Sequence, residues 1–168
     1  EALIDTLGIE KALGKKMHSS MFEPGLNLQD YIRKNRFPHI SLGGKAALIV
    51  VAPATANIIG KLANGVADDL LTTTILASMA PVLICPAMNV NMWEHPLVKN
   101  NIRKLKDAGY LFVEPEKGKL ACGWEGIGRL AGVNRIEAEI EKILRNRKRL
   151  KGKKILVTAG ATIEPIDP

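Results

Sequence analysis

From Lys45 onward, short apolar runs alternate along the chain with stretches in which apolar residues recur at helical spacing. The apolar runs are rich in Val, Ile and Leu, and they predict buried strands at 46–52, 81–86, 110–113 and 154–158. The helical spacing predicts amphipathic helices at about 54–67, 69–79, 96–108 and 134–147. Strands that alternate with helices are typical of a parallel sheet covered on both faces. We therefore predict an α/β fold with a Rossmann-like or flavodoxin-like parallel sheet flanked by helices.

The two ends of the chain do not fit this pattern. A doubly wound sheet normally begins with a strand and a glycine-rich turn, whereas residues 1–16 have only helix-like sequence. We therefore expect the first strands of the fold to be missing. The strand at 154–158 follows a basic segment and leads into a glycine-containing turn of the kind that precedes a phosphate-binding helix. We predict an incomplete domain over 1–146, a basic linker over 147–153 and the start of a second, truncated domain over 154–168.

The composition agrees with a folded domain. The 168 residues are 46% hydrophobic, which is enough for a sizeable core. No apolar run reaches the ~18 residues of a membrane span, and residues 1–5 do not resemble a secretion signal, so we predict a soluble, cytoplasmic protein with no membrane partner. Cys85 and Cys122 are far apart and lie in no His/Cys cluster, which argues against a disulfide framework and against a metal site.

The net charge of +7 comes from one short segment. Eight of the 24 cationic residues lie within 142–154, which contains no acid, and the remaining 16 face 17 acidic residues. Cations are favoured at the end of a helix, and a solvated linker is the usual state of such a run. Since only 4% of the residues are aromatic and available for base stacking, we predict no nucleic-acid partner.

Three segments follow the carboxyl ends of predicted strands, where an open α/β sheet binds its ligands. The first, 53–57, combines small residues with the short polar side chains of Thr55 and Asn57. Small residues would let a flat cofactor approach the backbone beside the N–H groups of a starting helix. The alternative is that these side chains only cap the helix, since Thr and Asn are favoured at that position.

The second segment, 86–93, contains two asparagines, two methionines and a tryptophan. The amide of Asn89 could hold a carboxylate, and Met and Trp side chains could keep water away from it. Packing in the core is the alternative for the Met and Trp residues. We expect Met92 and Trp93 to be exposed apolar residues, which would suit a contact between subunits.

The third segment, 116–129, has four glycines among charged residues, and we predict a surface loop that is free to move. It carries Cys122, which we expect to be exposed and able to donate a proton, whereas Cys85 lies in an apolar strand and should be inert. His39 lies just before the first predicted strand, and a histidine there could act as a general base. An incidental surface cysteine and a core histidine are the alternatives.

Four segments, in this order along the chain, resemble the flavin-dependent cysteine decarboxylases: His39-Ile40, 53–57, 86–93 and Ala121-Cys122-Gly123. The likeness is strong over about 18–129 and points to the decarboxylase half of bifunctional enzymes of coenzyme A biosynthesis. Residues 154–168 resemble the start of the ligase half. The resemblance implies an FMN-dependent enzyme that decarboxylates 4′-phosphopantothenoylcysteine to 4′-phosphopantetheine, fused to a phosphopantothenate–cysteine ligase that uses CTP and Mg²⁺.

The resemblance also implies a role for each site residue. His39 would be the essential base beside the flavin, and Asn89 would bind the substrate carboxylate. Cys122, on a loop that closes over the substrate, would protonate the enethiol intermediate. The remaining matched positions would line the site, with Thr55 and Asn57 along the FMN, and Met92 and Ala121 against the substrate. Relatives place the flavin between subunits of trimers, which implies a homo-oligomer whose His39 and Asn89 come from different chains.

Two other classes of function fit the same residues. A non-catalytic module could bind a nucleotide or phosphate through the basic segment and the turn at 158–162, with the Met and Trp side chains as packing. Another flavoprotein of the same fold, either a peptidyl-cysteine decarboxylase or a flavin prenyltransferase, would share the sheet and the cofactor. Cys122 on a glycine-rich loop and the surroundings of Asn89 favour decarboxylation of a small-molecule substrate.

Overall fold

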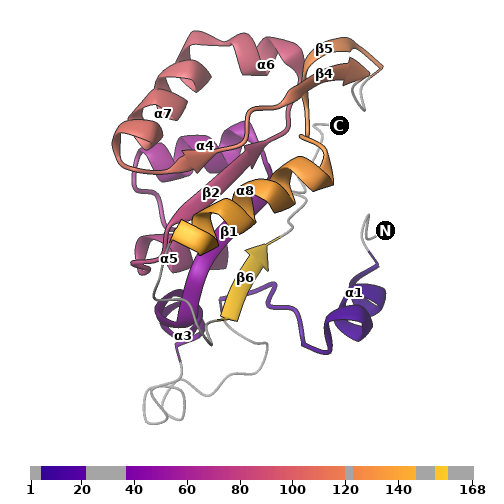
Figure 1. Cartoon of the computed structure of the whole chain (residues 1–168). Coiled ribbons are helices and arrows are strands. Elements are labelled where there is room, and N and C mark those ends of the chain that lie inside the picture. Colours follow the sequence, from indigo (N-terminus) through magenta and orange to yellow (C-terminus); the bar gives the residue numbers. More distant parts are fainter. Residues whose placement is uncertain (1–4, 22–36, 120–122, 147–153, 159–168) are drawn as a thin grey trace, which may run out of the picture.

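Four parallel strands form the central sheet of the computed structural model, which describes residues 5–21, 37–119, 123–146 and 154–158 (Figure 1). Their order across the sheet is β3–β2–β1–β6, and their bounds are Leu111–Phe112 (β3), Val82–Pro86 (β2), Ala46–Ala54 (β1) and Lys154–Thr158 (β6). In the parallel registers, Ile49 of β1 lies opposite Val82 of β2, and Leu83 of β2 lies opposite Leu111 of β3. The predicted α/β fold with a parallel sheet is confirmed.

Helices cover both faces of this sheet. The helices of the described residues are α1 (Thr6–Leu13), α3 (Pro38–Lys45), α4 (Ala56–Ala63), α5 (Leu70–Leu76), α6 (Val90–Glu94), α7 (Pro96–Asp107) and α8 (Val133–Asn146), of which α1 buries no residue. α4, α5 and α7 pack against one face, and α8 packs against the other (Figure 1). The four predicted helices are confirmed as α4, α5, α7 and α8. Among the described residues, no helix has the length and apolar character needed to cross a membrane.

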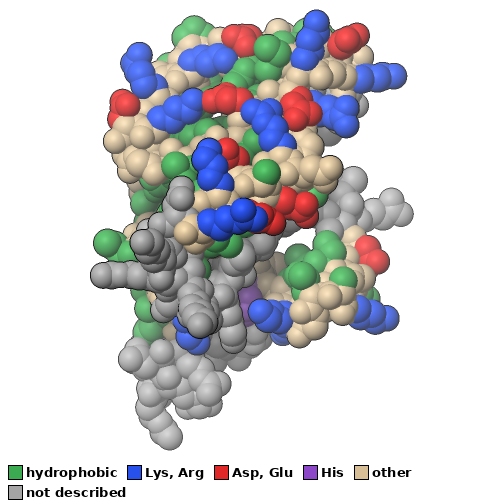
Figure 2. Space-filling model, viewed as in Figure 1, with side chains coloured by type: hydrophobic (Ala, Val, Ile, Leu, Met, Phe, Trp, Pro, Cys, Tyr) green, Lys and Arg blue, Asp and Glu red, His purple; other side chains and the backbone are tan. Residues whose placement is uncertain are grey.

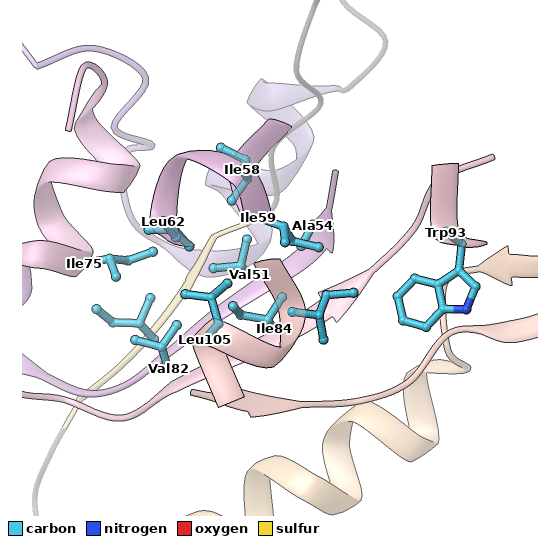
Figure 3. Close-up of a cluster of buried hydrophobic side chains, with 12 residues drawn as sticks. Val51, Ala54, Ile58, Ile59, Leu62, Ile75, Val82, Ile84, Trp93 and Leu105 are labelled. Atoms are coloured by element: carbon cyan, nitrogen blue, oxygen red, sulfur yellow. The ribbon is translucent and has the colours of Figure 1, made fainter. Parts of the chain in front are cut away.

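The core follows from the two-residue period of β1. Ile49 and Val51 join the cluster under α4, α5 and α7, whereas Leu48 and Val50 join the cluster under α8. All four side chains are at most 2% exposed, and burying each contributes about 1.5–3 kcal/mol. Figure 3 shows the first cluster, in which Val51 and Ile84 of the sheet lie beside Ile59 of α4. Burial on both faces explains why these strands are continuous apolar runs.

Two segments predicted to be loops contain regular structure. Within the range 116–129, which we predicted to be a free surface loop, β4 (Glu116–Lys119) and β5 (Glu125–Arg129) pair as the antiparallel strands of a hairpin. Backbone pairing holds the hairpin, and its charged and glycine residues have no apolar alternation that would reveal strands. The loop expected at 87–95 contains α6, whose first turn is capped by the Asn89 side chain.

α3 was not predicted. Pro38 occupies its first turn, where proline is favoured, but the glycines at 43 and 44 lower the helix propensity of so short a segment. Gly43 is buried against α5, so a tertiary contact stabilises this helix where local preference does not.

β6 pairs in parallel with β1, with Val157 opposite Val50 and Thr158 opposite Val51. The strand predicted at 154–158 is therefore confirmed, and it lies in the same sheet as β1. The division of the chain at residue 146 stays a prediction, and the turn expected at 159–162 lies outside the described residues.

Candidate functional site

The three segments predicted to carry chemistry meet at the carboxyl edge of the sheet. The N–H of Ala87 donates a hydrogen bond to the carbonyl oxygen of Ala54 at 3.0 Å, which joins the end of β2 to the end of β1. The next N–H, that of Met88, donates to the carbonyl oxygen of Gly128 in β5, also at 3.0 Å. The ends of two parallel strands and the hairpin therefore form one continuous edge, where an open α/β sheet places its ligands.

Thr55 caps α4 at this edge. Its Oγ1 accepts a hydrogen bond from the N–H of Ile58 at 3.4 Å, so the capping role considered for Thr55 is confirmed. Asn57 is exposed in the first turn of the same helix. Because α4 begins where β1 ends, its first N–H groups and the positive end of its dipole lie at the edge. A hydroxyl that accepts one bond can still donate another, so capping and cofactor contact are compatible.

Asn89 caps α6 in a way that orients its amide. The Oδ1 atom accepts a hydrogen bond from the N–H of Asn91 at 2.8 Å. Since the oxygen holds the backbone N–H, the amide orientation is set and its other polar group is the NH2 donor. A donor without negative charge suits the binding of a carboxylate, as predicted for this residue.

Met92 and Trp93 differ in exposure although they are neighbours on α6. Met92 is 46% exposed, whereas Trp93 is only 6% exposed and belongs to the core cluster of Figure 3. The prediction that Trp93 is an exposed interface residue is therefore wrong, because one face of a helix points inward and Trp93 lies on that face. The ammonium group of Lys99 lies 4.1 Å from the centre of the Trp93 ring and covers it further.

The hairpin brings the third segment to this edge. Lys119 of β4 pairs with Glu125 of β5, and β5 packs against α6. Ala121 and Cys122, predicted to face the substrate, lie outside the described residues. Their roles stay predictions.

His39 lies in the first turn of α3. Its Nδ1 atom is buried and has no hydrogen-bond partner among the described residues. The centre of the Phe37 ring lies 6.1 Å from that of the imidazole. A buried polar atom without a partner is unfavourable, so a bound molecule or a second subunit that supplied one would stabilise this arrangement.

The structure does not bring His39 to the edge that carries Asn89. α3 leads into the amino end of β1 and packs on α5, whereas α6 follows the carboxyl end of β2 (Figure 1). β1 has nine residues, which corresponds to about 30 Å of extended chain. One chain therefore gathers Thr55, Asn57 and Asn89 at one end of the sheet, with His39 at the other.

Cys85, the cysteine outside the predicted site, has an unreactive thiol. Cys85 is fully buried in β2, and burial raises the pKa of its thiol to about 11. Because the thiolate is the reactive form, Cys85 is inert near neutral pH, as predicted. Among the described side chains, no group of three or more His, Cys, Asp or Glu gathers as a metal site.

Charges of both signs are interspersed over α7 and α8 on the face that Figure 2 shows. Ion pairs join several of them, including Lys106 with Glu114 at 2.6 Å and Lys142 with Glu139 at 2.9 Å. Over the described residues of this face, charges of opposite sign therefore offset one another. Within the basic segment, the described cations Lys142 and Arg145 pair with Glu139 and Glu141.

Sequence reasoning missed the residues that hold these segments together. Gly126 and Gly128 bring β5 against 88–90, and Gly43 brings α3 against α5. A signal for the first pair was present, since glycines two residues apart in a strand share one face. This spacing could be interpreted only once the structure showed that Gly126 and Gly128 lie in a strand.

The sequence and the structure are similar to known proteins. The chain is 55% identical over 132 residues to the coenzyme A biosynthesis bifunctional protein CoaBC of Bacillus subtilis, a match that covers 77% of this chain and 32% of that protein. It thus spans about a third of the length of that curated relative.

Two solved structures share the fold. The first is an FMN-dependent cysteine decarboxylase, SpaF, with a TM-score of 0.65 and 32% identity, covering 84% of this chain and 73% of that chain. The second is a PPC decarboxylase mutant complexed with pantothenoylaminoethenethiol, with a TM-score of 0.57 and 30% identity, covering 76% and 66%. The sequence pattern of the Flavoprotein family matches residues 6–145, and with these likenesses it shows that the chain belongs to the Flavoprotein family.

Proposed function

We propose that the chain is the decarboxylase part of a bifunctional enzyme and converts 4′-phosphopantothenoylcysteine to 4′-phosphopantetheine with FMN as cofactor. The observation that carries this proposal is the joining of the Thr55 and Asn89 segments at one sheet edge, in a chain 55% identical to a CoaBC protein. The ligase activity, with CTP and Mg²⁺, would belong to the rest of such a protein. A role in coenzyme A biosynthesis would place the enzyme in the cytoplasm.

The residues at the site fit a flavin. Pro53, Ala54 and Ala56 have small side chains, so a flat ring can approach the backbone beside the first N–H groups of α4. The exposed amide of Asn57 can bond to the carbonyl and N–H edge of such a ring. His39 lies at the other end of the sheet in the same chain, and its buried Nδ1, which lacks a partner among the described residues, offers a polar atom to a ligand held between two subunits.

Each proposed role follows from the chemistry of the side chain. Asn89 would hold the substrate carboxylate through its NH2 group and so align the C–C bond that breaks. FMN, when bound, would supply a two-electron oxidation of the C–S unit, so that the oxidised group accepts the electron pair of the C–C bond as CO2 leaves, and would later return the hydride. His39 would take the proton released in the oxidation, and Cys122 would donate the proton that completes the product thiol.

We propose that the working enzyme is a homo-oligomer built from trimers, with His39 of one subunit beside Asn89 of another. The support is the placement of α3 and α6 at opposite ends of the sheet, which leaves a single chain without the base at the carboxylate site. Exposed apolar side chains lie near both residues, with Ile40 at 54% and Met92 at 46% exposure. Two open cavities on the described surface, of about 380 and 490 Å³, contain none of the proposed site residues.

Other cysteine carboxylates are the second candidate substrates, because SpaF is named as an FMN-dependent cysteine decarboxylase. Such an enzyme would use the same flavin edge and the same carboxylate contact. An enzyme for 4′-phosphopantothenoylcysteine and one for other cysteine carboxylates would differ in the residues that contact the part of the substrate beyond the cysteine.

The test is to supply purified, FMN-loaded full-length protein with 4′-phosphopantothenoylcysteine, free cysteine or a peptide ending in cysteine. We expect a yellow protein that releases CO2 fastest from 4′-phosphopantothenoylcysteine. Replacing a positioned acid lowers a rate by about 10²–10⁴-fold, so Cys122→Ser should release CO2 and accumulate the unsaturated thiol. His39→Asn should prevent the substrate from bleaching the flavin. A colourless protein, or one that prefers the peptide, would contradict the proposal.

A further inference from the structure

We propose that the β4–β5 hairpin fixes the position of Asn89, with Gly126 and Gly128 as the positioning residues through which it acts. This inference rests on the proposed role of Asn89 in binding the substrate carboxylate. In this proposal the hairpin contributes to substrate binding by holding Asn89 in place, and its own side chains take no part in that contact.

Gly128 joins the hairpin to the residue before Asn89. Its carbonyl oxygen accepts the hydrogen bond of the Met88 N–H at 3.0 Å. A Cβ atom at position 128 would collide with the carbonyl oxygen of Met88 and would lie 3.6 Å from the carbonyl carbon of Asn89. Backbone atoms cannot turn aside as the end of a flexible side chain can, so only glycine lets β5 approach this closely.

Gly126 makes the matching contact on the other side of Asn89. A Cβ atom at position 126 would lie 2.9 Å from Cγ2 and 3.1 Å from Cβ of Val90. Val90 is the first residue of α6, and a β-branched side chain in a helix has little rotamer freedom with which to move away. The two glycines are two residues apart in β5, so both project from the face that packs on 88–90.

The two contacts enclose Asn89. Met88 before it and Val90 after it both touch the hairpin, while its own Oδ1 accepts the N–H of Asn91 at 2.8 Å. The backbone and the amide of Asn89 are therefore both fixed, and the NH2 group is held in one direction. A displacement of about 1 Å at such a contact is enough to lower a rate by about 10²-fold.

The hairpin provides its own matched control. Gly118 of β4 is paired directly with Gly126 of β5. A Cβ atom at position 118 would meet only the end of the Arg129 side chain, at 3.3 Å. Gly118→Ala and Gly126→Ala therefore make the same chemical change in the same hairpin, and only the second presses on Val90.

The experiment compares Gly126→Ala, Gly118→Ala and Gly126→Ala/Val90→Ala in the FMN-loaded full-length protein. For each we measure kcat/KM with 4′-phosphopantothenoylcysteine and the inhibition constant of 4′-phosphopantetheine, which lacks the carboxylate. Loss of a charged hydrogen bond predicts that Gly126→Ala lowers kcat/KM about tenfold or more. The inhibition constant of 4′-phosphopantetheine for Gly126→Ala should stay within about twofold of the value for the unsubstituted protein, because 4′-phosphopantetheine has no carboxylate to contact the Asn89 donor. Val90→Ala removes the colliding methyl groups, so the double variant should regain most of the loss.

An equal effect of Gly118→Ala and Gly126→Ala would overturn the positioning role, and so would parallel losses for both ligands or the absence of rescue. If Gly126→Ala does not fold or retain FMN, Val90→Ile enlarges the opposite side of the same contact and should give the same selective loss. Protein with both glycines intact that releases no CO2 would instead defeat the proposed function, and this inference with it.

Discussion

The hydroxyl of Ser78 donates a hydrogen bond to the carbonyl oxygen of Gly43 at 2.8 Å and joins the segment after α5 to the last turn of α3. The Oγ atom of Ser78 in turn accepts a hydrogen bond from the N–H of Ala80 at 3.0 Å. Gly43 is buried and follows His39 by four residues, so the two share one face of the helix. The contact that holds α3 on α5 therefore also sets where the proposed base lies.

Replacing each of two adjacent glycines in α3 by alanine should change the free energy of unfolding in opposite directions. A Cβ at position 43 would lie 2.9 Å from the carbonyl oxygen of Thr74, whereas a Cβ at position 44 would meet nothing within 4 Å. Gly43→Ala should lower the free energy of unfolding by about 1–3 kcal/mol through overpacking. Gly44→Ala should raise it by up to about 1 kcal/mol, since Ala favours helix. Urea unfolding of both variants measures this, and equal shifts would contradict the contact.

Asn89→Asp separates the capping role of residue 89 from substrate binding. An aspartate can still accept the N–H of Asn91, so the thermal midpoint should hardly change. It cannot donate to a carboxylate and repels one, so kcat/KM should fall at least about 10²-fold. Asn89→Ala should lose the activity and also about 1 kcal/mol of stability with the cap. Near-normal turnover of the aspartate variant would rule out carboxylate binding by this side chain.

Asn57→Ala tests the proposed flavin contact without disturbing the fold. The side chain is exposed in the first turn of α4, and alanine is a better helix former, so stability should stay the same or rise slightly. Loss of one hydrogen bond should weaken FMN binding about fivefold to tenfold. Titration of the apoprotein with FMN, followed by flavin fluorescence, gives the two dissociation constants. An unchanged constant would remove Asn57 from the flavin site.

The stability that the ionised Asp69 carboxylate gives to the folded protein should be lost at acidic pH. Burial disfavours ionisation of its carboxyl, but hydrogen bonds from Thr72 and Lys61 outweigh burial and hold its pKa below 3.8. A depressed folded-state pKa contributes stability above the unfolded value, and this contribution is lost as pH falls through the folded value. Asp69→Asn keeps the cap of α5 but loses the ion pair with Lys61, which lies 3.0 Å away. The stability difference between the two proteins should therefore be present at pH 7 and shrink below about pH 4. Urea midpoints across this range measure it, and a constant difference would show that Asp69 does not ionise as described.

Cys85 should react slowly with thiol reagents while the protein is folded. Burial raises its pKa to about 11, so the thiolate is scarce at pH 8. Iodoacetamide labelling followed by peptide mass spectrometry should show protection of Cys85 in buffer and rapid labelling in urea. Equal rates in both conditions would mean that β2 opens readily.

Much of the architecture was predictable because it depends on local periodicity. The short, β-branched apolar runs at 46–52 and 81–86 predicted buried strands, and the helical spacing in 54–67 and 134–147 predicted helices with one buried face. Because parallel strands share their carboxyl edge, the meeting of Thr55 and Asn89 there followed from the order of elements alone.

Three features depended on contacts between residues distant in sequence. The hairpin at 116–129 has no apolar alternation, and the close approach of Gly128 to Met88 shows how it docks. α3 has poor local propensity, yet Gly43 lets it pack on α5. The burial of Trp93 depends on which face of α6 meets the core.

The sequence by itself therefore determined the four strands of the central sheet, the helices α4, α5, α7 and α8, the edge that carries the candidate site and the kinds of side chain there. Only the tertiary structure decided which of these side chains share that edge, leaving His39 at the other end of the sheet. The physical reason is that periodicity reports which face of an element is buried, whereas steric fit between distant backbone segments decides which elements touch.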